Sequence, residues 1–96
     1  MSRFKLLIVY DGTKYQGWQI QKDGRTVQGI IENAFRDLSE FDRKIQVNGS
    51  GRTDAGVHAL GQVAHVDFDT NLKIQVFKNA LNAKLPEDCR IISVEQ

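Results

Sequence analysis

The sequence has few of the residues that mark special classes of protein, with one cysteine and one proline among its 96 residues. A single cysteine, Cys89, cannot form an internal disulfide, which fits a reducing compartment, and we expect it to be a small buried residue. No apolar run approaches the roughly 20 residues that a membrane helix needs. The N-terminus lacks the apolar core and cleavage site of a signal peptide. These absences predict a soluble cytoplasmic protein.

The chain also lacks a strong excess of charge, because 13 basic and 12 acidic residues give a formal net charge of +1. Domains that bind nucleic acid often announce themselves by a strongly basic balance, so composition alone does not indicate RNA. An apolar content of 41% with 26% charged residues is ordinary for a globular domain. We therefore expect residues 1–96 to form one domain with a modest core.

The spacing of apolar and turn-forming residues predicts six elements in the order β-α-β-β-α-β. The expected strands and helices are a strand over 4–10, a helix over 27–40 capped by Thr26, strands over 44–48 and 63–68, a second helix ended by Pro86, and a strand over 91–94. This order predicts an α+β fold of the ferredoxin-like split βαβ type, with a four-stranded antiparallel sheet and two helices on one face.

Both helices carry finer expectations. On the first helix, the charged side chains of Glu32, Arg36 and Asp37 are expected to lie on its solvated face. The second helix is expected to be capped by the side chains of residues 69–71. Its apolar residues, which are spaced less regularly, are Leu72, Ile74, Val76, Phe77, Ala80 and Leu81.

A glycine-rich segment, residues 48–59, joins the second and third predicted strands and concentrates unusual chemistry. Its glycines allow positive φ angles or close approach to a ligand. Arg52 lies two residues before Asp54, so a bent backbone can bring them into contact and keep the carboxylate ionised, as a nucleophile or base must be. The alternative is that Asp54 and Thr53 only close a turn by bonding their own backbone.

Two other arrangements of these polar residues are weaker. Asp54, His58, His65 and Asp67 are residue types that bind zinc or manganese, but compact zinc-binding spacings are missing, so we predict no metal site. His65 and Asp67 are expected to share one face of a strand. Ser50 with His58 and Asp54 has the composition of a hydrolase triad, but the G-x-S-x-G turn is missing.

Two strings resemble one known family. Gly51-Arg52-Thr53-Asp54-Ala55-Gly56-Val57-His58-Ala59 closely resembles the catalytic loop of the tRNA pseudouridine synthase A (TruA) family, and Tyr10-Asp11-Gly12-Thr13-Lys14-Tyr15-Gln16-Gly17-Trp18-Gln19 resembles the loop after that family's first strand. The likeness extends over essentially the whole chain, including residues 80–82 and 85–88, but covers only the N-terminal portion of such an enzyme.

The resemblance implies a cytoplasmic, homodimeric enzyme that converts uridine to pseudouridine in the anticodon arm of tRNA without a metal or organic cofactor. Asp54 matches the family's catalytic aspartate. Arg52 matches its loop arginine, which we assign to orienting Asp54 and filling the stack that a flipped uridine leaves. Whether Asp54 attacks C1′, adds to C6 or removes the 2′ proton stays open. Since the family's remaining part supplies a stacking tyrosine and a basic partner, residues 1–96 alone are expected to be inactive.

The resemblance also marks residues that bind RNA or shape the loops. These are Tyr10, Asp11, Gly12, Tyr15, Gly17, Trp18, Gln19, Gly51, Thr53, Gly56 and His58. For the aromatic residues both roles stay open, because Tyr15 and Trp18 can stack on bases or a sugar edge, and Trp18 can equally anchor the loop against the domain.

The main alternative is a non-catalytic RNA-binding module, because RNA recognition motifs share this fold and stack bases on sheet aromatics. The third predicted strand offers only Phe68 for stacking and lacks the K/R-G-F/Y pattern. A regulatory ligand-binding domain of the same architecture is also compatible with the fold. It leaves the glycine-rich segment unexplained.

Overall fold

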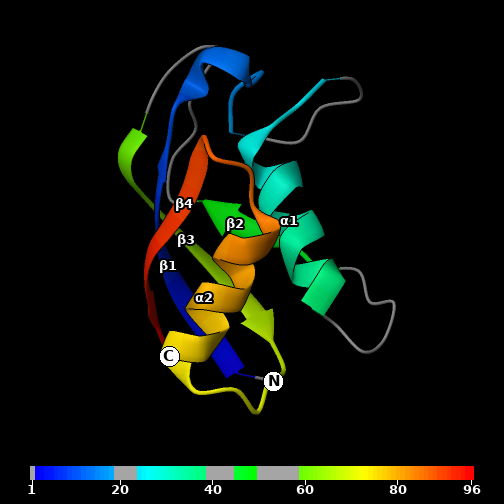
Figure 1. Ribbon diagram of the computed structural model, residues 1–96, viewed down its shortest axis with the longest axis vertical. Coiled ribbons are helices and arrows are strands. Elements are labelled where there is room, and N and C mark those ends of the chain that lie inside the picture. The colour runs from blue at the N-terminus through cyan, green and yellow to red at the C-terminus, as the bar shows by residue number, and fades with distance from the viewer. Residues whose placement is uncertain (1, 19–23, 39–44, 50–58) are drawn as a thin grey trace.

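The structure, a computed structural model, describes residues 2–18, 24–38, 45–49 and 59–96, with side chains described outside 59–61 (Figure 1). Within these ranges the elements are β1 (Ser2–Tyr10), a 3₁₀ turn (Gly12–Lys14), α1 (Val27–Leu38), β2 (Val47–Gly49), β3 (Ala59–Phe68), α2 (Ile74–Lys84) and β4 (Cys89–Glu95). Neither helix is long and apolar enough to cross a membrane within the described residues.

The four strands form one antiparallel sheet in the order β2-β3-β1-β4. Phe4 of β1 pairs with Val66 of β3, and Val66 pairs in turn with Val47 of β2. Both helices pack on the same face of the sheet (Figure 1). The predicted split βαβ fold is therefore confirmed, since β3 lies between the two strands of the first βαβ unit, β1 and β2, and β1 lies between those of the second, β3 and β4.

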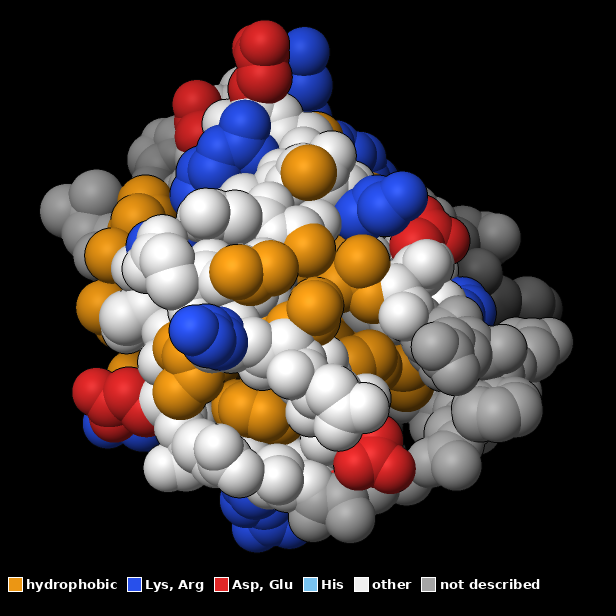
Figure 2. Space-filling view, turned by 60° about the horizontal axis from the view of Figure 1, so that its bottom comes forward, with side chains coloured by type: hydrophobic (Ala, Val, Ile, Leu, Met, Phe, Trp, Pro, Cys, Tyr) orange, Lys and Arg blue, Asp and Glu red, His pale blue; other side chains and the backbone are white. Residues whose placement is uncertain are grey.

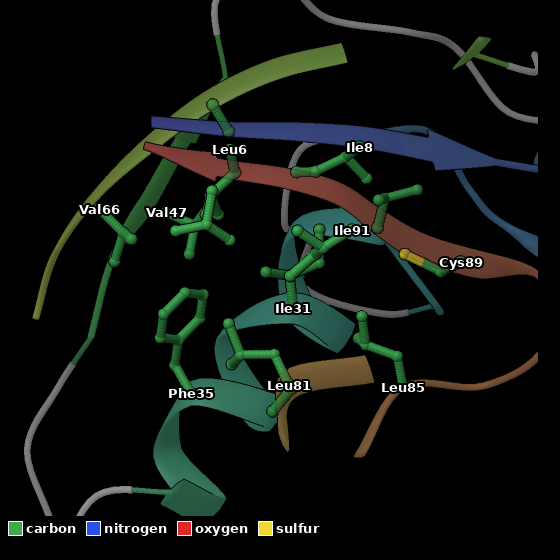
Figure 3. Close-up of a cluster of buried hydrophobic side chains, with 14 of the residues drawn as sticks. Leu6, Ile8, Ile31, Phe35, Val47, Val66, Leu81, Leu85, Cys89 and Ile91 are labelled. Atoms are coloured by element: carbon green, nitrogen blue, oxygen red, sulfur yellow. The ribbon is translucent and has the colours of Figure 1, made fainter. Parts of the chain in front are cut away.

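The core lies between the sheet and the two helices. Alternate residues of β1 point into it, and Phe4, Leu6 and Ile8 are buried, as the period-two pattern of this strand predicts. Figure 3 shows how side chains from both helices and all four strands meet there. At one end of the core, the Phe68 ring stacks on the Phe77 ring with a centroid distance of 5.5 Å.

Helix α1 begins as predicted, because the Thr26 hydroxyl accepts a hydrogen bond of 3.2 Å from the backbone N–H of Gly29. The prediction that Glu32 lies on the solvated face is wrong, since this residue is only 7% exposed. Its carboxylate accepts bonds from the backbone N–H of Val47 (2.9 Å) and from Gln28 Nε2 (3.1 Å). Strand β2 lies at a sheet edge, so this N–H needs a partner outside the sheet, and Glu32 supplies it.

Helix α2 begins later than predicted. Lys73 precedes its first turn, and no side chain caps it. The Thr70 hydroxyl instead accepts a 3.1 Å bond from the N–H of Leu72, which closes a turn ahead of the helix. The capping role expected for residues 69–71 is therefore wrong, because their side chains bond locally in this turn or stand at least partly exposed outside the helix.

The apolar residues expected for the second helix fall into a buried and an exposed group. Phe77 and Leu81 are buried, whereas Leu72, Ile74 and Val76 are between 40% and 49% exposed. Figure 2, turned so that the end of the molecule where α2 begins comes forward, shows several hydrophobic side chains at the surface. Only one narrow stripe of this helix faces the sheet, since residues 77 and 81 are one turn apart.

Side chains fix the C-terminal end of α2 to β4. The Asn82 side chain exchanges two hydrogen bonds with the backbone of Ile91, donating at 2.9 Å and accepting at 2.8 Å. The Arg90 guanidinium donates to the carbonyls of Leu85 (3.3 Å) and Pro86 (2.9 Å). Carbonyls at a helix end lack partners within the helix, so these contacts satisfy groups that burial would otherwise penalise.

The buried carboxylate of Glu32 gives a prediction about stability. Glu32→Ala should lower the free energy of unfolding by about 1–3 kcal/mol, because the N–H of Val47 loses its acceptor. Asp37→Ala, an exposed position of the same helix, should change it by less than about 0.5 kcal/mol. Urea unfolding of both variants measures the difference, and equal losses would contradict the structural role of Glu32.

Candidate functional site

Sheet topology brings the segment after β1 and the residues that flank 50–58 to one end of the sheet. Strands β1 and β2 are each antiparallel to β3, so they are parallel to one another and their C-terminal ends point the same way. Tyr10, at the end of β1, pairs with Ala59 at the start of β3 and with Cys89 at the start of β4. The segment after β1 and both flanks of residues 50–58 therefore lie at the same end of the sheet, away from the chain termini (Figure 1).

Many of the predicted site residues lie outside the described residues. These are Gln19, Gly51, Arg52, Thr53, Asp54, Gly56 and His58. The structure places the other predicted residues, which lie at the end of β1 or in the segment after it: Tyr10, Asp11, Gly12, Tyr15, Gly17 and Trp18.

Asp11 and Gly12 build the turn that follows β1. The Asp11 carboxylate accepts bonds from the backbone N–H of Thr13 (3.0 Å) and from its hydroxyl (2.6 Å). The carbonyl of Gly12 accepts a 3.0 Å bond from the N–H of Tyr15. Of the two roles expected for these residues, this geometry favours loop shaping, because such Asx turns fix the backbone locally.

The three aromatic residues of the segment are packed into the domain. Tyr10, Tyr15 and Trp18 are each 3% exposed. The Tyr10 ring lies between the other two, with centroid distances of 6.2 Å to Tyr15 and 6.4 Å to Trp18. Gly17 before Trp18 has a φ of +91°, a conformation that favours glycine. A buried ring has no free face for a base, so the packing favours the anchoring role of Trp18.

Asp88 connects this segment to β4. Its carboxylate accepts a 2.5 Å bond from the Tyr15 hydroxyl and two bonds, of 3.0 and 3.2 Å, from the Arg25 guanidinium. The Arg25 guanidinium also lies 4.3 Å from the centroid of the Tyr15 ring. The bond from Arg25 lowers the pKa of Asp88. Burial, followed by the bond to Asp88, raises the pKa of Tyr15, so its hydroxyl keeps its proton and donates.

The sequence alone gives no role to the pair formed by Arg25 and Asp88. Asp88 falls within residues 85–88, which are part of the family resemblance, but that string does not say what the carboxylate contacts. Arg25 has no sequence signal, because its partner is 63 residues away in the chain.

The same segment completes the N-terminus of α1. The carbonyls of Gly17 and Trp18 accept bonds from the N–H groups of Val27 (3.2 Å) and Gln28 (2.9 Å), which have no partners within the helix. The Gln28 side chain then donates a 2.9 Å bond to the carbonyl of Val47 in β2. Helix α1 therefore bonds both to the segment after β1 and to the strand that precedes residues 50–58.

Trp18 lies against the last residue of β2. A Cβ atom placed on Gly49 would come within 2.7 Å of Cε2 and Nε1 of the Trp18 indole and 2.8 Å of Gln62 Nε2. Real Cβ atoms do not approach other atoms so closely, so only glycine fits beside this ring. In the sequence Gly49 is one of the glycines of the glycine-rich segment, and nothing there predicts this contact.

The sheet face opposite the helices carries charge. His65 and Asp67 share this face, as predicted, and the Asp67 carboxylate is bonded by Arg3 at 2.9 and 3.3 Å. The part of the chain that the structure describes contains no cluster of three or more histidine, cysteine or acidic residues that could hold a metal ion. Cys89 is buried, which confirms the prediction, and burial raises its pKa to about 12.

The structure weakens the RNA-recognition alternative. Phe68, the aromatic residue that the third strand offered as a stacking platform, is 6% exposed and stacks on Phe77 in the core. An aromatic residue used for base stacking must instead stand on the open face of the sheet.

Comparison with known proteins points to one family. The sequence model of the family described as tRNA pseudouridine synthase matches residues 6–96. A protein of Thermodesulfovibrio yellowstonii named tRNA pseudouridine synthase A is 48% identical over 95 residues, covering 99% of this chain and 37% of that protein. Proteins of the same name from Ligilactobacillus salivarius and Afipia carboxidovorans are 48% and 49% identical, covering 95% and 99% of this chain. The chain spans 36% and 38% of those two proteins.

The Asp88 contacts predict a pH-dependent contribution to stability. Asp88→Asn should lower the free energy of unfolding by about 1–3 kcal/mol at pH 7, because the bonds from Arg25 and Tyr15 lose their charged acceptor. The folded-state pKa of Asp88 is lowered. Its contribution is therefore complete above the unfolded pKa, about 3.9, and is lost as the pH falls through the folded value.

Chemical unfolding between pH 3 and 7 measures this effect. Asp67→Asn is the matched control, because it removes an arginine-bonded carboxylate whose side chain is 51% exposed, compared with 23% for Asp88. Exposed ion pairs contribute little, so the control should change stability much less. A difference between wild type and Asp88→Asn that grows as the pH falls would contradict the assignment.

Proposed function

Because the chain belongs to the tRNA pseudouridine synthase family, we propose that its protein converts uridine to pseudouridine in the anticodon arm of tRNA. The observation that carries the proposal is that β1 and β2 both end at the end of the sheet where β3 begins, so the described residues after β1 and the two residues that flank 50–58 lie at one place. A reaction that detaches and reattaches a base needs reactive and positioning groups at one place. The topology supplies such a place from segments about 40 residues apart in the chain.

The reaction breaks the bond between C1′ and N1 of the uridine and forms one between C1′ and C5, while the C5 proton is lost and N1 gains one. We propose Asp54 as the carboxylate that starts it, by attack on the sugar or the base or by removal of the 2′ proton. Arg52 is the proposed partner that holds Asp54 ionised and oriented. No metal or organic cofactor is part of this proposal.

The target uridine lies in a stacked arm and must leave its stack to reach a carboxylate, at a cost of a few kcal/mol. With a formal net charge of +1, residues 1–96 carry little of the charge that phosphate binding requires. We therefore propose that most phosphate contacts come from other parts of the full-length protein, as a homodimer. A tRNA substrate and a single cysteine favour a cytoplasmic location.

The role of Asp54 predicts the effect of one substitution. Asp54→Asn in the full-length protein should reduce pseudouridine formation at least about 10³-fold, because an amide of nearly the same shape has neither the charge nor the basicity. Release of tritium from tRNA labelled at uridine C5 measures turnover. Asp37→Asn, on the exposed side of α1, is the control and should leave turnover unchanged. Near-normal turnover by Asp54→Asn would refute the assignment. Wild-type protein that binds tRNA without any tritium release would favour the RNA-binding alternative.

The role of Arg52 predicts a different pattern. Arg52→Lys keeps the positive charge but loses the planar fork that holds a carboxylate with two bonds. We expect turnover to fall about 10- to 100-fold with tRNA affinity nearly unchanged, since the lost interaction acts on Asp54. Affinity is measured by titration at several salt concentrations. An equal fall in affinity and turnover would instead identify Arg52 as a phosphate ligand.

A further inference from the structure

We propose that Trp18 is a positioning residue, whose indole fixes the direction in which the chain leaves β2 for the segment that carries Asp54. The inference rests on the proposed function, and it gives a role to a side chain that is packed into the domain.

Trp18 is in close contact with the end of β2. The indole of Trp18 lies so close to the backbone of Gly49 that a Cβ atom there would approach it to 2.7 Å. Gly49 is the last residue of β2. Because the strand ends against this rigid ring, the ring limits the positions that the chain can take on leaving the sheet.

Hydrogen bonds from α1 hold the two sides of this contact together. Gln28 is bonded to both sides of the contact, because its backbone N–H donates to the carbonyl of Trp18 (2.9 Å) and its side chain donates to the carbonyl of Val47 (2.9 Å). The carboxylate of Glu32 bonds both to Gln28 and to the N–H of Val47. Trp18 and β2 are therefore tied to the same turn of α1, which sets the distance between them.

Two tyrosine rings support the indole of Trp18. The Tyr10 ring lies 6.4 Å from it, and Tyr15 follows at 6.2 Å from Tyr10. Tyr15 is held in turn by its 2.5 Å bond to Asp88. A side chain in such a row keeps its rotamer because its neighbours leave it no other space.

The placement of Asp54 is the quantity that this arrangement controls. Gly49 precedes Asp54 by five residues, so a change in the position or direction of Gly49 is carried into the segment that bears the carboxylate. A misplacement of about 1 Å at a reacting group can lower a rate about 100-fold. The buried indole is thus expected to affect turnover while leaving the binding of tRNA largely unchanged.

The test uses Trp18→Leu, Gly49→Ala and the double variant in the full-length protein. Trp18→Leu removes the ring but leaves the backbone bond to Gln28 intact. Gly49→Ala forces the same contact apart from the other side. Each single variant should lower kcat about 10- to 100-fold with KM changed by less than about threefold. The double variant should have a kcat within about threefold of Trp18→Leu alone, because the smaller side chain makes room for the new methyl group.

Phe77→Leu is the matched control for lost core packing. It shortens an equally buried aromatic residue that packs on Phe4, Phe35 and Phe68. It should lower Tm through lost core packing while kcat stays within about twofold of wild type. Hydrogen exchange adds a readout that does not need activity: exchange in peptides covering residues 45–64 should increase in Trp18→Leu and not in Phe77→Leu.

The outcomes separate the two proposals. Wild-type protein that forms no pseudouridine in tRNA overturns the proposed function. Active wild type, with equal kcat in Trp18→Leu and Phe77→Leu or with unchanged exchange over residues 45–64 in Trp18→Leu, overturns the positioning role alone. The positioning role is supported if kcat falls in the Trp18 and Gly49 variants and not in Phe77→Leu, and if the losses of the two single variants do not multiply in the double variant.

Discussion

The pairing of β3 with both β1 and β2 is the constraint on which the rest of this structure depends. Two strands that are antiparallel to a common neighbour are parallel to each other, so the chain leaves β1 and β2 at the same end of the sheet. Between β1 and β2 the chain must return to the other end of the sheet, and it does so through α1. The helix packs on the face of the sheet that carries the apolar side chains. The proximity of the segment after β1 to the residues that flank 50–58 is thus a consequence of strand order.

Helix α1 and the segment after β1 depend on each other. The helix begins with N–H groups that have no partner within it, and the carbonyls of Gly17 and Trp18 accept two of these bonds. In return the helix fixes the backbone of that segment. The helix also satisfies the edge of β2 through Glu32, which explains why a charged side chain is buried in a small domain. Polar contacts here set the relative positions of three elements, whereas apolar packing supplies most of the stability.

The two motifs have different physical characters. In the segment after β1, Asp11 bonds to its own turn, the carbonyls of Gly17 and Trp18 bond to α1, and the Tyr15 hydroxyl bonds to Asp88. The rings of Tyr15 and Trp18 are buried. That segment therefore forms a rigid frame. The glycine-rich segment contains the carboxylate and guanidinium whose types suit the proposed chemistry. Such a division is consistent with a site in which fixed elements hold a reactive group in place, since preorganisation lowers the cost of reaching the transition state.

How much the sequence alone determines follows from the range of each interaction. The period of two in residues 4–10 and 63–68 and the spacing of apolar residues in α1 predicted the strands, the first helix and the fold, because these patterns reflect local geometry. The cap of Thr26 on α1 is likewise local. The capping expected for α2 failed because several polar residues in a row can each close a turn, and the sequence does not say which one begins the helix.

The tertiary structure decided what depends on distant partners. Glu32 has the sequence pattern of a surface residue, and only its position over the edge of β2 makes it a buried acceptor. The bond between Arg25 and Asp88 and the contact between Trp18 and Gly49 join residues 63 and 31 positions apart. Local periodicity carries no information about such pairs. Their meeting is fixed by strand order and by the way α1 crosses the sheet, which only the folded chain possesses.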